Sequence, residues 1–258
     1  GVASGAVSNQ VSDVAHAEVI FLIGANPISN HPVAATWIKN AVKKGAKFIY
    51  ADPRRSELAR HATHYLQFKP DTDVALLNAM MHTIVHEGLV NEAFIASRTI
   101  GYEDLRKNVE GYSPEAMAPL CGIPAETIKE VARLYATSKG SMILWGMGIS
   151  QHVHGTDNAR CLIALTLMTG QIGKPGSGLH PLRGQVELAR DGASGAAAHL
   201  QVEDGVAAHP GLHALEQLRL GRRGRQALVG TRHGELGARE RSRDRPRADD
   251  VRVVGRDG

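Results

Sequence analysis

Cysteine is scarce in this sequence of 258 residues, which contains only Cys121 and Cys161 and no CxxC pair. Two thiols are too few for a zinc or iron–sulfur site built only from cysteines, so neither site is expected within this chain. The two positions also argue against a disulfide framework and favour reduced thiols, as in cytosolic proteins. The sequence therefore predicts a cytoplasmic location.

Long hydrophobic runs are absent as well. The longest candidates, such as residues 161–165, fall far short of the ~20 apolar residues that a membrane-spanning helix needs. The amino-terminal residues lack the pattern of a signal peptide, so no membrane association is expected. The first residue is Gly rather than Met, which we interpret as the sign of a fragment or a processed chain.

The net charge of +4 raises the question of nucleic-acid binding. Much of the arginine lies after residue 185, and the basic residues are not interleaved with aromatic ones. Nucleic acid is therefore not favoured as a partner.

Composition changes abruptly near Gln185, because residues 186–258 contain no Lys, Asn, Ile, Met, Cys, Phe, Tyr or Trp. Such a segment can bury little apolar surface and is not expected to order alone. Three interpretations remain: a disordered Arg-rich tail that binds nucleic acid or an acidic partner, a loosely packed helix around residues 212–220, or the out-of-frame translation of a GC-rich gene. We favour the third interpretation, because the change falls within a motif described below.

In residues 1–185, short apolar runs alternate with helical patterns. The runs at residues 19–23 and 47–51 are continuous, which is typical of strands covered on both faces. Further strands are expected over residues 65–68 and 141–145. The expected helices cover residues 32–44, 56–61, 72–87 and 156–168, with Asp71 as the cap of the third.

Between residues 90 and 138 the pattern is helical throughout, with helix starts at Ser113-Pro114 and Pro124. Strand–helix alternation on either side predicts an α/β fold with doubly wound, mostly parallel sheets. We expect one αβ region over residues 1–185 with a helical insert at about residues 90–138, followed by a separate tail over residues 186–258.

Polar or glycine-rich turns follow three of the expected strands, beginning at Gly24, Asp52 and Gly146. Ligands of open parallel sheets bind outside the carboxyl ends of the strands. Asp52 could accept hydrogen bonds from a ribose or a guanine edge, and Arg54 or Arg55 could face phosphates. The turns predict a nucleotide-like site, with a simple turn as the alternative for Asp52. The absence of GxGxxG and GxxxxGK[ST] disfavours a standard NAD or ATP site.

Glycine is dense in residues 170–178, which predicts a loop wrapped around a ligand, with a flexible linker as the alternative. His152 and His154 form an HxH pair near Asp157, so a metal site is conceivable. Polar loop residues are the favoured interpretation, and no metal ligand is assigned.

Six motifs occur in order along the chain: IGANP at 23–27, ADPRR at 51–55, KPDTDVALLN at 69–78, GMGISQH at 146–152, LMTGQIGKPG at 167–176 and PLRGQ at 181–185. Together they resemble the molybdenum- and tungsten-dependent formate dehydrogenases, within the bis-molybdopterin guanine dinucleotide oxidoreductases. The resemblance covers about residues 1–185, and its last two motifs are long and specific. It is closest to the alpha subunit of the soluble, NAD-dependent type.

The resemblance implies a bis-molybdopterin guanine dinucleotide cofactor with Mo or W, whose dinucleotide arms lie on the carboxyl ends of the strands. Cofactor contacts are then expected at Gly24, Asn26, Asp52, Arg54, Asp71, Asp73, Met147 and Gln151. The family's catalytic arginine corresponds to Arg183, with Gln185 as a polar partner. A guanidinium would hold the formate carboxylate as hydride leaves. A structural salt bridge is the alternative for Arg183.

The sequence departs from the family at both ends. The family's metal-binding Cys or selenocysteine and its 4Fe-4S cysteines belong before Gly1. Its Arg-Gly-Gln motif continues Asn-Asn-Val-Gln-Gly, whereas residues 186–188 here are VEL. We therefore expect an internal fragment, inactive alone, of a subunit that oxidises formate and passes electrons through flavin and iron–sulfur subunits to NAD+. The alternatives are another molybdopterin oxyanion reductase, such as nitrate reductase, or a non-catalytic binding protein with a basic tail.

Overall fold

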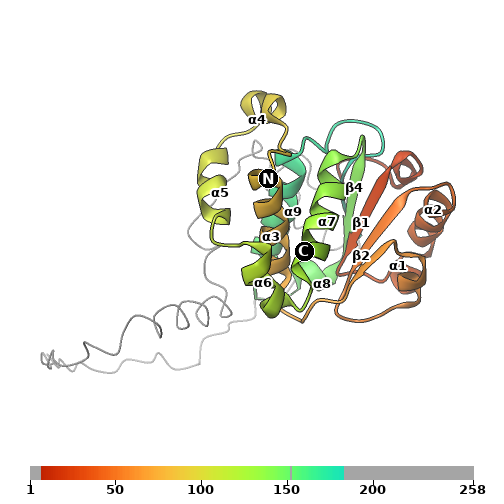
Figure 1. Ribbon diagram of the computed structural model, residues 1–258. Helices are drawn as coiled ribbons and strands as arrows, with labels where there is room; N and C mark the ends of the chain where they lie inside the picture. The colour runs from red at the N-terminus through yellow and green to blue at the C-terminus, as the bar shows by residue number, and fades with distance from the viewer. Residues whose placement is uncertain (1–6, 152, 183–258) are drawn as a thin grey trace, which may run out of the picture. The chain divides into compact units, whose positions relative to one another are not determined.

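Five parallel strands form the centre of the fold in the computed structural model, which describes residues 7–151 and 153–182. The strands are β1 (Val19–Ile23), β2 (Lys47–Ala51), β3 (His64–Leu66), β4 (Ser141–Trp145) and β5 (Gly178–Pro181). Their order in the sheet is β3-β2-β1-β4-β5, and every neighbouring pair is parallel. The chain thus starts in the middle, builds one edge and then returns to build the other (Figure 1). This order confirms the predicted doubly wound α/β architecture.

Helices connect the strands on both faces of the sheet (Figure 1). The α-helices are α1 (Pro27–Asn30), α2 (Pro32–Lys43), α3 (Asp73–His86), α4 (Glu92–Arg98), α5 (Tyr102–Val109), α6 (Pro114–Cys121), α7 (Ala125–Thr137), α8 (Met147–Ser150) and α9 (Gly155–Met168), and the 3-10 helices are η1 (Val11–His16) and η2 (Glu57–His61).

Strand side chains alternate between two buried layers. Phe21, Ile23 and Ile143 belong to the layer that includes residues of α3, α7 and α9. Ile20 and Leu22 belong to the opposite layer, which includes residues of η1, α2 and η2. Burial on both faces explains why β1 is apolar along its whole length and β4 is apolar after Ser141.

Local signals in the sequence set several helix boundaries. In α6, the Ser113 hydroxyl accepts a hydrogen bond from the Ala116 N–H (3.3 Å), and Pro114 occupies the first helical position. Gly122 follows the helix with a φ of 79°, a conformation that glycine adopts without steric cost. In α4, the Asn91 side chain accepts from the Phe94 N–H (3.0 Å). These caps explain why the predicted helix starts were accurate in this region.

Some local expectations were wrong. Gly178, the last residue of the predicted glycine-rich loop, begins β5, and the Ser8 N–H donates to the Leu179 carbonyl (3.0 Å) of this strand. The turn predicted at residues 146–148 instead enters the short helix α8 at Met147. Thr72, not Asp71, is the N-cap residue of α3.

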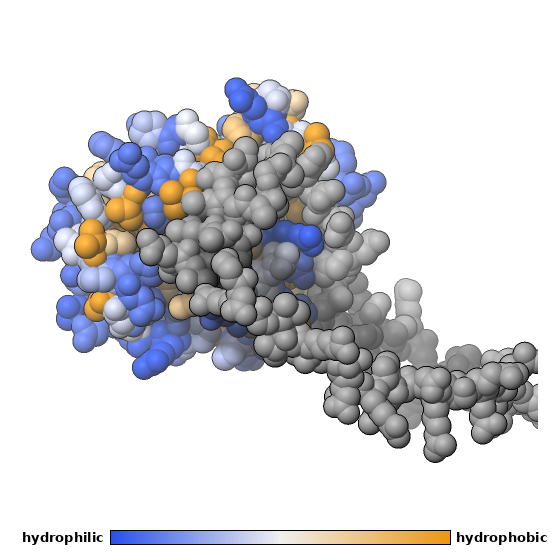
Figure 2. All heavy atoms as spheres, turned by 180° about the vertical axis from the view of Figure 1, so that it is seen from behind, coloured by the Kyte–Doolittle hydropathy of each residue, from blue (hydrophilic) through white to orange (hydrophobic). Residues whose placement is uncertain are grey.

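Among the described residues, no helix is both long enough and apolar enough to cross a membrane. On the coloured atoms of Figure 2, hydrophilic residues predominate and hydrophobic ones are scattered among them. Scattered exposed apolar side chains are normal for a folded domain.

Candidate functional site

Two turns meet at the point where the strand order reverses, between β1 and β4. Ile23 and Trp145 are paired in the register of these strands, so the turns that follow them start side by side. The Gly148 N–H donates to the Gly24 carbonyl (3.0 Å). In doubly wound sheets this reversal point opens a crevice at the carboxyl edge, where ligands bind. Gly24 and Met147, both predicted as contacts, are therefore brought together at this edge.

The glycines of these turns allow the two backbones to touch. A Cβ atom on Gly148 would lie 2.7 Å from the Gly24 carbonyl oxygen, and one on Gly146 would lie 2.8 Å from the Ala25 Cβ. Gly24 itself has a φ of 58°, which L-residues rarely adopt. The sequence had indicated that glycine admits a ligand here. The structure uses these glycines first for packing one turn on the other.

Asn26, the third residue after β1, has a buried acceptor atom. Its side-chain Nδ2 donates to the Ser29 hydroxyl (3.1 Å), whereas Oδ1 is buried and has no hydrogen-bond partner among the described residues. Buried polar atoms are rarely left unpaired in native proteins. A hydrogen-bond donor of a bound ligand would satisfy this atom.

The Asp52-Pro53-Arg54 turn follows β2, beside the β1 turn. The Asp52 carboxylate accepts a hydrogen bond from the Arg54 N–H (2.7 Å). From β3, the Tyr65 hydroxyl donates to the Asp52 carbonyl (3.1 Å), and the segment after β3 contributes Gln67, whose Nε2 donates to the Pro53 carbonyl (3.0 Å). The turn is thus held from the side of β3, and the Arg54 side chain is exposed at the edge.

Burial governs the electrostatics of this turn. Partial burial raises the pKa of Asp52, and the N–H and positive charge of Arg54 oppose this shift. The Arg55 guanidinium lies over the Tyr65 ring, 5.3 Å from its centroid. Sequence analysis missed Tyr65 and Gln67 as supports of the turn, because only the pairing of β2 with β3 brings them there.

The carboxylates before α3 differ in their surroundings. Asp71 is exposed and has a φ of 62°, so it occupies a left-handed turn between β3 and α3. Asp73 is the first residue of α3 and is only 3% exposed. The helix dipole favours a carboxylate at this position. Only Asp71 is therefore accessible at the surface, although both were predicted as cofactor contacts.

The remaining predicted contacts lie around α8. Met147 begins this helix and is 42% exposed, and the exposed Gln151 follows it, with its N–H bonded to the Met147 carbonyl (2.8 Å). Helices α2, α3 and α9 all begin after the carboxyl ends of strands, so their amino termini are directed to this edge. Helix amino termini favour anions such as phosphates.

Arg183 and Gln185, the predicted catalytic residues, lie outside the described residues. The last residue that the structure describes is Leu182, whose N–H donates to the Trp145 carbonyl (2.7 Å) at the end of β4. The predicted catalytic motif thus follows directly in sequence from a residue at the carboxyl edge. His152 of the HxH pair is likewise outside the described residues.

Two histidines that were not assigned from the sequence interact electrostatically. His180, in β5, is buried, and burial lowers its pKa, a shift to which His31 also contributes. His31 directly precedes α2. Their separation in the sequence gave no signal of this interaction.

The cysteines offer no reactive thiolate. Both are free and buried. Burial, followed by the charges of Asp157 and Asp73, raises the pKa of Cys161 to about 12, and burial also raises the pKa of Cys121. Among residues 7–151 and 153–182, no group of three or more His, Cys, Asp or Glu side chains is arranged to hold a metal ion.

Comparison with known proteins identifies a matching protein family. Residues 2–230 match the family model described as molybdopterin oxidoreductase. The chain is 44% identical over 184 residues to formate dehydrogenase H of Escherichia coli, covering 71% of this chain and 26% of that protein. It is 45% identical over 182 residues to F420-dependent formate dehydrogenase 1 subunit alpha of Methanococcus maripaludis, covering 70% and 27%. A nitrate reductase of Synechocystis is 34% identical over 190 residues, covering 73% and 27%.

The fold is also similar to that of a solved structure. Acetylene hydratase from Pelobacter acetylenicus superimposes with a TM-score of 0.59 at 25% identity, covering 65% of this chain and 25% of that one. The chain thus spans about a quarter of the length of the curated relatives that it matches.

Proposed function

Because this chain belongs to the molybdopterin oxidoreductase family, we propose that it is part of the alpha subunit of a formate dehydrogenase. The relatives named formate dehydrogenase are more similar to it than the nitrate reductase is. The observation that carries the proposal is the set of turns gathered at the strand reversal between β1 and β4. That is where a doubly wound sheet binds a dinucleotide.

The cofactor that we propose is bis-molybdopterin guanine dinucleotide with Mo or W. The edge has groups that fit its chemistry: the unpaired Asn26 Oδ1 and the Asp52 carboxylate can accept hydrogen bonds from guanine, and the exposed Arg54 can pair with phosphate. Asp71, Met147 and Gln151 would complete the contacts, with Gly24 shaping the turn and Asp73 acting from within α3. When bound, this cofactor supplies two-electron redox chemistry.

We assign substrate binding to Arg183 and Gln185. Formate oxidation converts HCOO− into CO2, one proton and two electrons. A guanidinium pairs with the formate carboxylate through two parallel hydrogen bonds and orients its C–H bond. It also holds the negative charge in place while the C–H bond breaks. Gln185 would add an amide hydrogen bond to the same anion.

We propose that the two electrons leave through iron–sulfur and flavin groups, on other parts of the subunit and on partner subunits, and reduce NAD+ to NADH. The F420-dependent relatives make F420 the alternative acceptor. That those relatives are named as alpha subunits supports an assembly with further subunits. The free cysteines are consistent with a cytoplasmic location.

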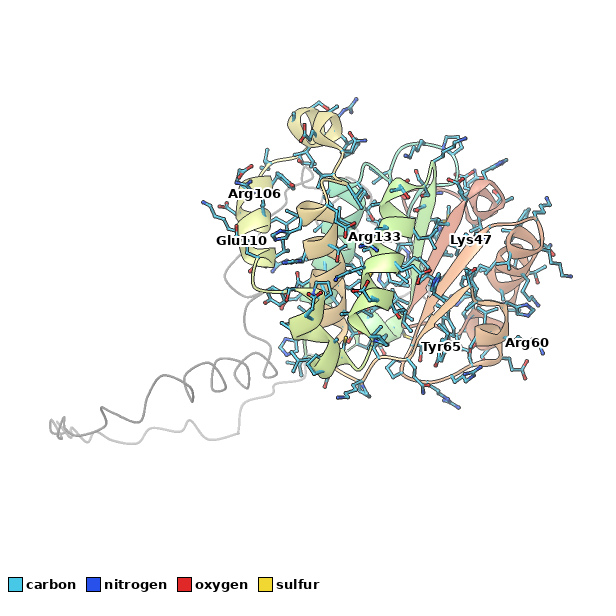
Figure 3. All side chains as sticks on the ribbon, viewed as in Figure 1. Lys47, Arg60, Tyr65, Arg106, Glu110 and Arg133 are labelled. Atoms are coloured by element: carbon cyan, nitrogen blue, oxygen red, sulfur yellow. The ribbon has the colours of Figure 1, made fainter. Side chains whose placement is uncertain are left out.

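The test restores the rest of the subunit by completing the gene at both ends, and then measures formate oxidation with NAD+ or F420 as acceptor. We expect Arg183→Ala and Arg183→Lys each to lower kcat/KM for formate by at least about 100-fold, since lysine lacks the planar fork. Arg106→Ala is the matched control, because Arg106 pairs with Glu103 on the surface of α5 (Figure 3). Unchanged turnover in both Arg183 variants contradicts the assigned role.

A further inference from the structure

The charged side chains of α2 and its flanking residues are all positive. Residues 19–51 contain no Asp or Glu, but they contain Lys39, Lys43, Lys44 and Lys47. None of these lysines takes part in the ion pairs found within the described part of the chain. By contrast, Arg133 of α7, on the other face of the sheet (Figure 3), forms an ion pair with Glu87, with 2.7 Å between Nη2 and Oε1.

Arg60, in the last turn of η2, adds a positive charge, whereas Glu57 begins the same helix. The Arg60 Nε donates to the His61 Nε2 (3.2 Å). Burial, and then the positive charges of Arg60 and of two lysines of α2, lower the pKa of His61. Those two lysines are Lys39 and Lys43. Leu58 and Ala59 of η2 share a buried layer with Ile38 and Ala41 of α2, so the two helices lie on the same face of the sheet. Because the lowered pKa favours the neutral form of His61, we call Lys39, Lys43, Lys44 and Arg60 the basic face.

Apolar side chains lie beside the basic face. Val33 and Trp37, one turn apart on α2, are 68% and 37% exposed. Trp37 also borders a hollow of about 250 Å³ between η1 and α2, lined by Ala15, Trp37, Asn40, Ala41, Lys43 and Lys44. An exposed tryptophan at the rim of a hollow is the type of side chain that anchors protein interfaces.

We propose that the basic face and Trp37 form a docking surface for an acidic protein partner. Unpaired lysines are complementary to a carboxylate-rich surface, and they steer its approach. Val33, Trp37 and the hollow supply an apolar centre, which protein interfaces have and which a phosphate backbone does not require. Since α2 begins at the carboxyl edge and ends at Lys43, its last turns lie away from the candidate cofactor site. The proposal therefore does not depend on the proposed reaction.

The test titrates the 258-residue chain with a glutamate-rich peptide that carries one phenylalanine. Trp37 fluorescence reports binding, because the other tryptophan, Trp145, is only 6% exposed. We expect saturable binding that weakens as salt is raised. The double variant Lys39→Glu/Lys43→Glu should bind at least about tenfold more weakly.

The matched control is Lys107→Glu/Lys174→Glu, which makes the same charge change at exposed lysines of α5 and of the loop before β5. It should retain affinity within about a factor of two, and unfolding curves should show that both variants fold. Equal losses in the two variants, or no binding by the wild type, overturn the proposal. Tighter binding of a DNA oligonucleotide of equal charge through Lys39 and Lys43 would overturn it in favour of nucleic acid.

Discussion

Gly148 is the residue on which the contact between the β1 and β4 turns depends most directly. Its missing Cβ would lie 2.7 Å from the Gly24 carbonyl oxygen, so a methyl group there must push the two turns apart. We expect Gly148→Ala to lower the free energy of unfolding by roughly 1–3 kcal/mol, as overpacking does in other cores. Urea denaturation measures the change. Gly111→Ala is the control, because no atom lies within 4 Å of the added methyl group.

We expect the Asp52 carboxylate to lower the stability of the fold, although we propose that it binds the cofactor. Burial raises its pKa, so above that pKa the folded chain holds a carboxylate that water would solvate better. Asp52→Asn keeps an acceptor for the Arg54 N–H and removes the charge, so it should raise the free energy of unfolding at pH 7. The gain should shrink as pH falls through the raised pKa toward the ordinary ~4 of aspartate, where the wild type is also neutral.

Urea denaturation at a series of pH values measures this dependence. Asp104→Asn serves as the control, since Asp104 lies in the first turn of α5, where the helix dipole favours a carboxylate. The control should show no gain at any pH. A stability loss in Asp52→Asn at pH 7 would contradict the argument from burial.

At the scale of elements, α3 contains an unusual polar residue. Asn78 is fully buried, and neither of its amide atoms has a hydrogen-bond partner among the described residues. An unpaired buried amide costs free energy that an apolar side chain of similar size does not. We expect Asn78→Leu to raise the free energy of unfolding by roughly 1–3 kcal/mol. The exposed Asn40→Leu in α2 should change it little, and a clear loss in Asn78→Leu would mean that the amide is paired in solution.

Elements with one dominant local signal were predictable from the sequence. Strands β1, β2 and β4 are buried and apolar except for Lys47 and Ser141, which begin β2 and β4, and α6 has a Ser cap, a Pro start and a Gly stop. The short helices α1 and α8 were not found, because four residues provide no periodicity. Strand β5 was missed because Gly178, His180 and Pro181 give it the composition of a loop, and only pairing with β4 makes it a strand.

At the scale of the whole molecule, local sequence signals predicted some features of the candidate site and missed others. Turns that follow strands could be placed at one edge, because parallel strands all end there. The supports of the Asp52 turn and the electrostatic interaction between His31 and His180 were not predictable, since they join segments distant in the sequence. The basic face was missed for the same reason. Sequence patterns indicate which residues reach an edge, whereas tertiary packing decides which of them meet.

Among the described residues, the buried side chains of the two layers extend from Val14 to Leu182, and this allows the predicted boundary near Gln185 to be tested. Residues 186–258 lack Ile, Met and every aromatic side chain, so they have little apolar surface to add. We expect a chain that ends at Gln185 to unfold cooperatively in urea with the same midpoint as the full chain.

The control for this truncation ends before Gly178 and so removes β5. That change exposes the edge of β4 and deletes Leu179 and Leu182, which belong to the two buried layers. Fully burying one such leucine contributes about 1.5–3 kcal/mol, so the shorter chain should lose several kcal/mol or fail to fold. If the chain ending at Gln185 is also destabilised by that much, residues beyond 185 belong to the folded domain and the predicted boundary is wrong. If only the shorter chain is destabilised, the fold ends with β5.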